Sequence, residues 1–185
     1  MRRAAKGNLI VMHDLQAIID GLPGIYLIVA ADADYTMVAC SDERLRITMT
    51  RREDVIDKPL FEVFSDQQPD DPNSGAATLR RSLQQVIATG QPQRLTQVRY
   101  AIRRPDSSGG SFEERFWNVV NAPVKDAAGQ VRYIIHRVED VTAQRHAQEL
   151  ARAQLQESDE RLNAALLVSS TGTFYWQLKV FRRQG

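Results

Sequence analysis

Cysteine is almost absent from the sequence, and long apolar runs are absent altogether. The one cysteine, Cys40, excludes a disulfide within the chain and suits a reducing compartment. The longest apolar run, Ile25–Ala31, falls far short of the roughly 18–20 residues that a membrane-spanning helix needs. The apolar patch near the first residue is likewise too short for a signal peptide. We therefore expect this segment to be cytoplasmic, with no membrane contact.

The sequence also has almost no net charge, since 24 basic side chains stand against 23 acidic ones. Basic pairs such as Arg51–Arg52 and Arg103–Arg104 are scattered among acids and form no stripe with aromatic residues. Nucleic-acid binding needs such a stripe, so we expect no nucleic-acid partner. Hydrophobic residues make up 43% of the chain, which is enough for a soluble protein of this length to bury a core.

Groups for catalysis and metal binding are equally sparse. Three histidines and one cysteine at wide separations assemble neither a Ser-His-Asp or Cys-His set nor a metal-spaced cluster. The Gly-rich stretch Ser107–Gly110 is followed by no helix or lysine, so it cannot bind a phosphate as a P-loop does. The sequence predicts no catalytic residue and no metal site in this chain.

The pattern of apolar residues predicts two strands, several short helices and then three more strands. Apolar runs bounded by turn residues indicate the strands, at Ile25–Asp32, Thr36–Cys40, Gln93–Arg104, Phe112–Val124 and Val131–Val141. Capping residues and helical spacing indicate the helices between them, and a short helical cap over residues 1–24. We expect an α+β domain over residues 25–141, with one five-stranded antiparallel sheet and short helices on one face.

The junction after the last strand is the most informative feature, because "YIIHRVEDV" passes into a helix without any glycine or proline. Thr142 is placed to cap this helix, which we expect over residues 142–168. Leu150, Leu155 and Leu162 lie on weak, heptad-like seams. Two interpretations remain open: the helix folds back on its own domain, or it pairs with a copy of itself as a coiled-coil-like dimer.

Residues 169–185 favour the second interpretation. The segment "VSSTGTFYWQL" contains a Gly172 break and then an aromatic run that predicts a strand. A lone strand is not stable, so we expect this segment to be the truncated start of a second sheet domain. The helix would then be a stiff linker between two sheet domains.

Three stretches together resemble a PAS domain of bacterial sensory signalling proteins, as found in the N-terminal region of sensor histidine kinases. "VACSDERLRITMTRREDVIDKPLFEVF" is similar to the family's passage from the second strand into its helices. "RFWNVVNAPVKDAAGQVRYIIHRVEDVT" resembles its final hairpin and closing Asp-x-Thr motif. "ERLNAALLVSSTGTFYWQL" resembles the opening of a second PAS domain. Their order over some 160 residues makes the resemblance specific.

The resemblance implies a sheet that receives a stimulus or a partner and passes strain through its last strand into a signalling helix. It assigns the corner between that strand and the helix to Asp140 and Thr142, as signal-transmitting residues. Two positions depart from the family pattern. Asp57 stands where many relatives have glycine, and Ser41 stands where an asparagine usually opens the first long helix.

Cofactor chemistry known in the family lacks its usual residues here, so the cofactor is unknown. The light-sensing branch uses a cysteine in the middle helices, whereas Cys40 lies in a predicted strand and is expected to be a buried structural thiol. Haem-binding relatives commonly use a histidine on the long helix, and "LRRSLQQVIATG" has none. We expect His136 to be a hydrogen-bonded or exposed strand residue and His146 to be a surface residue.

The last three predicted strands carry a candidate small-ligand pocket. Tyr100, Phe116, Asn118 and Asn121 lie on neighbouring strands, and Trp117 points the opposite way from Phe116 and Asn118. A polar asparagine on an apolar inward face would either orient a ligand or bond to a loop carbonyl. Both alternatives stay open at this stage.

These features favour a sensory and dimerisation module of a two-component signalling protein that acts in a phosphorelay. The expected partners are a second copy, paired through the linker helix, and a downstream kinase or other output domain. The alternative is a stand-alone receptor that binds a small ligand or cofactor. An enzyme that uses the sheet cavity ranks last, because no convergent acid–base set is present.

Overall fold

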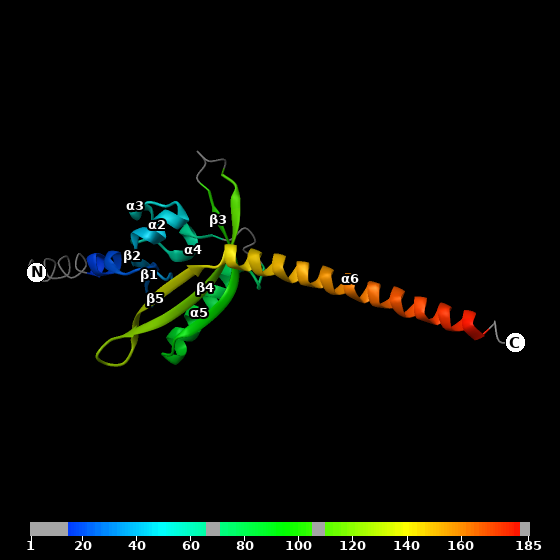
Figure 1. The fold of residues 1–185 in the computed structure, drawn as a ribbon. Helices are drawn as coiled ribbons and strands as arrows, with labels where there is room; N and C mark the ends of the chain where they lie inside the picture. Colours follow the sequence, from blue (N-terminus) through cyan, green and yellow to red (C-terminus); the bar gives the residue numbers. More distant parts are fainter. Residues whose placement is uncertain (1–14, 66–70, 105–109, 182–185) are drawn as a thin grey trace, which may run out of the picture. The chain divides into compact units, whose positions relative to one another are not determined.

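The computed structural model describes residues 15–65, 71–104 and 110–181, with side chains of the last helix described through Leu167 (Figure 1). The chain forms two compact units, Met1–Thr142 and Ala143–Gly185. Several predictions fall partly outside the described residues. These are the cap before residue 15, the Gly-rich stretch before residue 110 and the last four residues.

The first unit contains one five-stranded sheet in which every pairing is antiparallel. Its order is β2-β1-β5-β4-β3, so the first and last strands of the chain lie side by side in the middle. The predicted α+β fold is confirmed. The strands are β1 (Ile25–Ala30), β2 (Met37–Cys40), β3 (Gln93–Arg103), β4 (Phe112–Lys125) and β5 (Val131–Asp140).

The β4–β5 hairpin forms where the sequence has a tight turn signal. The Asp126 carboxylate accepts hydrogen bonds from the N–H groups of Ala128 and Gln130, and Gly129 takes a positive φ of 80°. An Asx turn followed by a left-handed glycine is the usual chemistry of such turns. This turn fixes the register of the two strands whose far ends build the candidate site.

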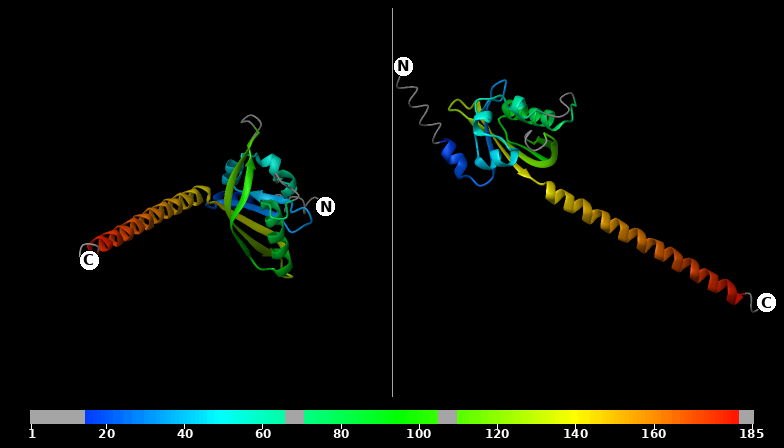
Figure 2. Two further views of the ribbon diagram at one scale, coloured as in Figure 1. Left: turned by 90° about the vertical axis from the view of Figure 1, so that its right-hand side faces the viewer. Right: turned by 90° about the horizontal axis from the view of Figure 1, so that it is seen from above.

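Within the described residues, four helices cover one face of the sheet. They are α2 (Asp42–Thr48), α3 (Arg52–Val55), α4 (Leu60–Val63) and α5 (Gly75–Thr89), and Figure 2 shows α5 lying along the strands. Leu83 and Val86 of α5 pack with Leu27, Val29 and Ile134 of the sheet, all fully buried. Burial of such side chains is the main stabilising term for this layer.

The opposite face of the sheet is partly covered too. Residues 15–21 are helical, and Ile19 is buried there against Ile28 and Ala39. Strand residues alternate between faces, so Ile28 points away from the core that contains Leu27. The described part of the predicted cap therefore packs on the face opposite the helices between β2 and β3.

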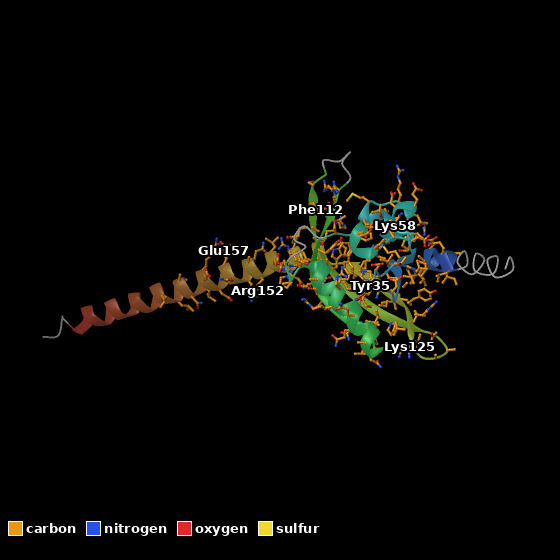
Figure 3. The ribbon with its side chains drawn as sticks, turned by 180° about the vertical axis from the view of Figure 1, so that it is seen from behind. Tyr35, Lys58, Phe112, Lys125, Arg152 and Glu157 are labelled. Atoms are coloured by element: carbon orange, nitrogen blue, oxygen red, sulfur yellow. The ribbon has the colours of Figure 1, made fainter. Side chains whose placement is uncertain are left out.

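The second unit consists mainly of the helix α6 (Thr142–Phe181), whose first residue, Thr142, ends the first unit and which begins where the sequence predicts it. It continues through Gly172, so the predicted break and strand after residue 169 are wrong. A helix satisfies its backbone hydrogen bonds internally, whereas a strand needs a partner strand to do so. Arg152 and Glu157 project from α6 in Figure 3, and both are exposed. Across the described residues, no helix combines the length and apolar character that crossing a membrane requires.

Candidate functional site

The strand–helix corner, made of Asp140, Val141 and Thr142, is tied to the neighbouring strand β4. Asp140 ends β5, and its Oδ1 accepts from the Thr142 N–H at 3.0 Å and from the Thr142 hydroxyl at 2.6 Å. The Thr142 Oγ1 in turn accepts from the Phe116 N–H of β4 at 2.9 Å. The Val141 N–H donates to the Phe116 carbonyl, also at 2.9 Å. One residue of β4, Phe116, thus bonds to both Val141 and Thr142.

The predicted capping role of Thr142 takes a different form in the structure. Its hydroxyl bonds across to β4, whereas a capping hydroxyl accepts from N–H groups in the first turn of its own helix. Residue alternation describes only side chains, so no sequence pattern identifies the Phe116 backbone as the partner. The corner is therefore fixed by the sheet as well as by the helix.

A charged side chain completes the corner. Arg115 of β4 donates to Asp140 Oδ2 at 2.8 Å and forms a second ion pair with Glu113, also at 2.8 Å. Burial would raise the pKa of Asp140, but the hydrogen bonds from Thr142 and Arg115 hold it below its ordinary 3.8. Asp140 is therefore ionised at neutral pH and accepts from all of these donors at once.

A cavity of about 400 Å³ lies between the inner face of the sheet and the helices α2, α4 and the start of α5. Its walls are mostly apolar, from Ile47 and Leu60 on the helices to Trp117 and Val138 on the strands. Its size falls within the range of small-molecule sites. Gly75 allows the close approach of α5 to β3, because a Cβ there would lie 2.4 Å from the Arg99 carbonyl oxygen.

The four side chains predicted for a pocket do not come together. Tyr100 lines the cavity, as does Trp117, whose indole N–H donates to the Tyr100 carbonyl at 3.1 Å. Phe116 and Asn118 are not among the lining residues, because they alternate with Trp117. The Asn118 side chain instead accepts from the Gln97 N–H at 3.1 Å, where β3 has an irregular register.

Asn121 fits neither alternative left open by the sequence. It is fully buried behind the cavity wall, where its Nδ2 donates to Ser82 of α5 at 2.8 Å. Its Oδ1 lies 2.7 Å from Nδ1 of His136, a residue that does line the cavity. The prediction of a hydrogen-bonded strand histidine is confirmed. Burial, and secondarily the charge of Arg44, holds the pKa of His136 well below its ordinary 6.5, so the ring is neutral.

Sequence reasoning missed Arg44, which lines the cavity from α2. Its side chain is only 7% exposed, and its guanidinium stacks over the Phe64 ring at 4.8 Å. An arginine in a polar helix is ordinarily solvated, so the residue type does not predict that Arg44 is buried. The available signal is spacing, because Arg44 and Thr48 are four residues apart and therefore share the helix face that is buried.

The residues present do not fit flavin–cysteine chemistry. Cys40, the one cysteine of the chain, is fully buried in β2 among core side chains and does not line the cavity. Burial raises the pKa of its thiol, which makes it a poor nucleophile. The prediction of a buried thiol is confirmed. In the part of the chain that the structure describes, no three His, Cys, Asp or Glu side chains gather to hold a metal ion.

The two departures from the resemblance have clear local roles. Ser41 is the N-cap of α2, and its hydroxyl accepts from the N–H groups of Tyr26 and Arg44 and donates to the Gly24 carbonyl. Asp57 has a positive φ of 61°, the left-handed conformation that glycine adopts most readily. The first substitution preserves a cap, and the second introduces backbone strain.

On α6, the predicted seam residues lie in solvent. Leu150, Leu155 and Leu162 are 61%, 64% and 60% exposed, and Leu166 and Leu167 are exposed as well. Ion pairs four residues apart, Arg145–Glu149 and Arg161–Glu157, stabilise the helix locally. The apolar seam thus has no partner among the described residues of this chain.

Solved structures similar to this chain share its fold. The LOV protein of Rhodobacter sphaeroides is 14% identical with a TM-score of 0.55, and the match covers 75% of this chain and 71% of that one. The PAS domain of Bordetella pertussis BvgS is 20% identical with a TM-score of 0.52, and the match covers 80% and 97%. No curated protein matches the chain. Residues 19–146, more than half of the chain, match the family model for the PAS fold, so the chain belongs to the PAS fold family.

Proposed function

We propose that this chain is a sensory module that passes a change at its cavity or at a bound partner through the strand–helix corner into α6. The observation that carries the proposal is the Thr142 hydroxyl, which bonds to Asp140 at the end of β5 and to Phe116 on β4. Membership of the PAS fold family supports a role in sensing.

The route from cavity to corner is short. Trp117 lines the cavity, and the adjacent residue, Phe116, holds the corner through its backbone. Val138 also lines the cavity, two residues before Asp140 on the same strand. A ligand or partner that shifts either strand would therefore change the geometry of the bonds to Thr142. Shifts of this kind are amplified where packed elements have discrete arrangements.

The output side of the proposal concerns α6. Its exposed leucines support pairing with a second copy through Leu150, Leu155 and Leu162, because an unpartnered apolar seam favours helix association. The resemblance in the sequence favours a cytoplasmic two-component protein, with a histidine kinase as the output domain. Sedimentation of the purified chain tests the pairing, and a monomer at all concentrations would contradict it.

The stand-alone receptor remains the second candidate, and the cavity is the observation that favours it. In that case binding would be the whole function, and α6 would not respond. The two candidates differ in whether the corner matters to an output.

The corner is tested by replacing Thr142 in the complete signalling protein. Thr142→Val keeps the shape of the side chain but removes the bonds of its hydroxyl to Asp140 and Phe116. We expect it to change the basal output several-fold and to weaken the response to stimulus. Thr142→Ser retains the hydroxyl and is the matched control, with near-normal output. If both variants behave like the unaltered protein, the corner is not the route of transmission.

A further inference from the structure

Arg44 is a buried cation without a counter-charge. Its Nε is the only buried side-chain nitrogen or oxygen atom in the described residues that lacks a hydrogen-bond partner. No carboxylate of the described residues forms an ion pair with it. The contact with Phe64 covers a face of the guanidinium and leaves its N–H edge, the edge that donates hydrogen bonds, unused.

The surroundings do not neutralise this charge. Burial lowers the pKa of Arg44 to about 10, which still leaves it protonated at neutral pH. His136, on the facing strand, is neutral. The other charged lining residues are Arg103, Arg104 and Glu62, so cationic side chains outnumber anionic ones around the cavity. Glu62 is exposed, and Arg104 is already paired with Glu113.

A buried, unpaired charge is among the most unfavourable arrangements in a folded protein. Arg44 would lose that penalty if an anion entered the cavity and accepted hydrogen bonds from the guanidinium edge. A carboxylate suits a single arginine, because its two oxygens match the fork of N–H donors and its one negative charge balances one positive charge. A phosphate dianion would call for a second buried cation, and the other two arginines of the lining, Arg103 and Arg104, are exposed.

The rest of the cavity indicates what the anion is attached to. Trp117, Val119 and Val138 provide an apolar wall on the strands, and Ile47 and Leu60 provide one on the helices. An indole ring and branched aliphatic side chains favour a flat or compact apolar body. A small polar dianion would leave this wall unused.

We propose that the cavity binds a small monocarboxylate with an apolar body, with its carboxylate on Arg44 and its body against Trp117. This inference rests on the proposed sensory function, since it names the class of molecule that the module would sense. In this arrangement the ligand contacts β4 one residue away from Phe116, the residue that holds the strand–helix corner.

Binding is tested on the 185-residue chain with matched pairs of probes. Phenylacetate, indole-3-acetate and decanoate are each compared with the corresponding neutral amide, by calorimetry and by the shift in melting temperature. At least one carboxylate is expected to bind and to raise the melting temperature, and its amide is expected to bind at least about 30-fold more weakly. The inference is overturned if no carboxylate binds, or if an amide binds as tightly as its acid.

Variants assign the effect to Arg44. Arg44→Met removes the unpaired charge, so we expect the melting temperature of the free protein to rise while carboxylate affinity falls at least about 30-fold. A lower melting temperature would instead show that the guanidinium stabilises the fold, and it would overturn the inference. Arg44→Lys keeps the charge without the fork and should retain part of the affinity.

Arg80→Met is the matched control for the aromatic contact. Arg80 stacks over the Phe61 ring at 4.0 Å but is exposed and does not line the cavity. Its replacement should leave carboxylate binding unchanged, and an equal loss in both variants would contradict a specific role for Arg44. The proposed ligand class and the proposed transmission route can be rejected independently of each other. Absent binding with an altered output in Thr142→Val rejects only the ligand class, and binding with no effect of Thr142→Val rejects only the route.

Discussion

Arg115 and Arg44 are both arginines held within the first unit, but their surroundings are opposite. Arg115 lies between two carboxylates, Asp140 and Glu113, and each pair is 2.8 Å apart. Arg44 is more deeply buried, yet its guanidinium stacks over an aromatic ring and pairs with no carboxylate of the described residues. Folding places one charge among partners and leaves the other facing a cavity.

The difference separates two uses of a buried charge. A fully paired network fixes a single geometry, which suits a corner that links the last strand to the following helix. An unpaired buried charge destabilises the protein unless a ligand of opposite charge binds to it, which suits a ligand-binding site. Replacing the two arginines by methionine should therefore change the free energy of unfolding in opposite directions.

The largest expected effect is at the paired arginine. Arg115→Met leaves the half-buried Asp140 without its cation, and we expect the free energy of unfolding in urea to fall by about 2 kcal/mol. Arg99→Met is the matched control, because its pair with Glu114 joins side chains that are 74% and 47% exposed. The control should change the stability by less than about 0.5 kcal/mol. Equal losses of stability in Arg115→Met and Arg99→Met would contradict a special role for the paired, partly buried arginine.

The charge of Asp140 gives a second, smaller test. Its pKa is lowered in the folded protein, so its contribution to stability is present above its ordinary pKa and is lost as the pH falls through the folded value. Asp140→Asn keeps an oxygen for Thr142 but has no charge to lose. Urea titrations from pH 6 to pH 3 should therefore show a decline smaller by about 1 kcal/mol in the variant. The same decline in both proteins would mean that the ion pair does not stabilise the corner.

The smallest effect comes from backbone strain at Asp57. Asp57→Gly relieves a positive φ on an exposed residue and keeps the hydrogen bond from its N–H to the Met37 carbonyl. We expect a gain of about 0.5 kcal/mol, because the extra flexibility of glycine in the unfolded chain offsets part of the relief. Carboxylate binding should be unaffected, which distinguishes this gain from that of Arg44→Met. A loss of stability would show that the Asp57 side chain has a role of its own.

Strand pattern and turn chemistry allowed the sheet to be predicted. The alternation in β3 and the turn signal at Asp126–Gly129 depend only on residues that are close in sequence. Tertiary contacts therefore do not change the structure that they predict. The corner was predicted for the same reason, because the absence of glycine and proline after Val141 is visible in the sequence. Its bonds to Phe116 were not, since they join the Phe116 backbone to the Val141 N–H and the Thr142 hydroxyl, groups that lie 25 and 26 positions further along the chain.

The cavity was predicted less well, because its residues depend on tertiary contacts. Arg44 reads as a solvated helix residue, and only the packing of α2 against the sheet makes it buried. Phe116 and Asn118 were assigned to the pocket although their alternation with Trp117 places them on the other face. The aromatic run after Gly172 favours a strand by local propensity, and helix α6 overrides that preference.

The hydrogen-bonding ladder between β4 and β5 does not stop at its last strand pair, Trp117 and Asp140, but continues through Val141 to Thr142. This has a practical meaning for protein engineering. A chimera that keeps the first unit and replaces α6 with another helix should be joined after Thr142. A junction placed earlier would remove Thr142, and with it the hydroxyl bond that joins the start of the helix to Phe116.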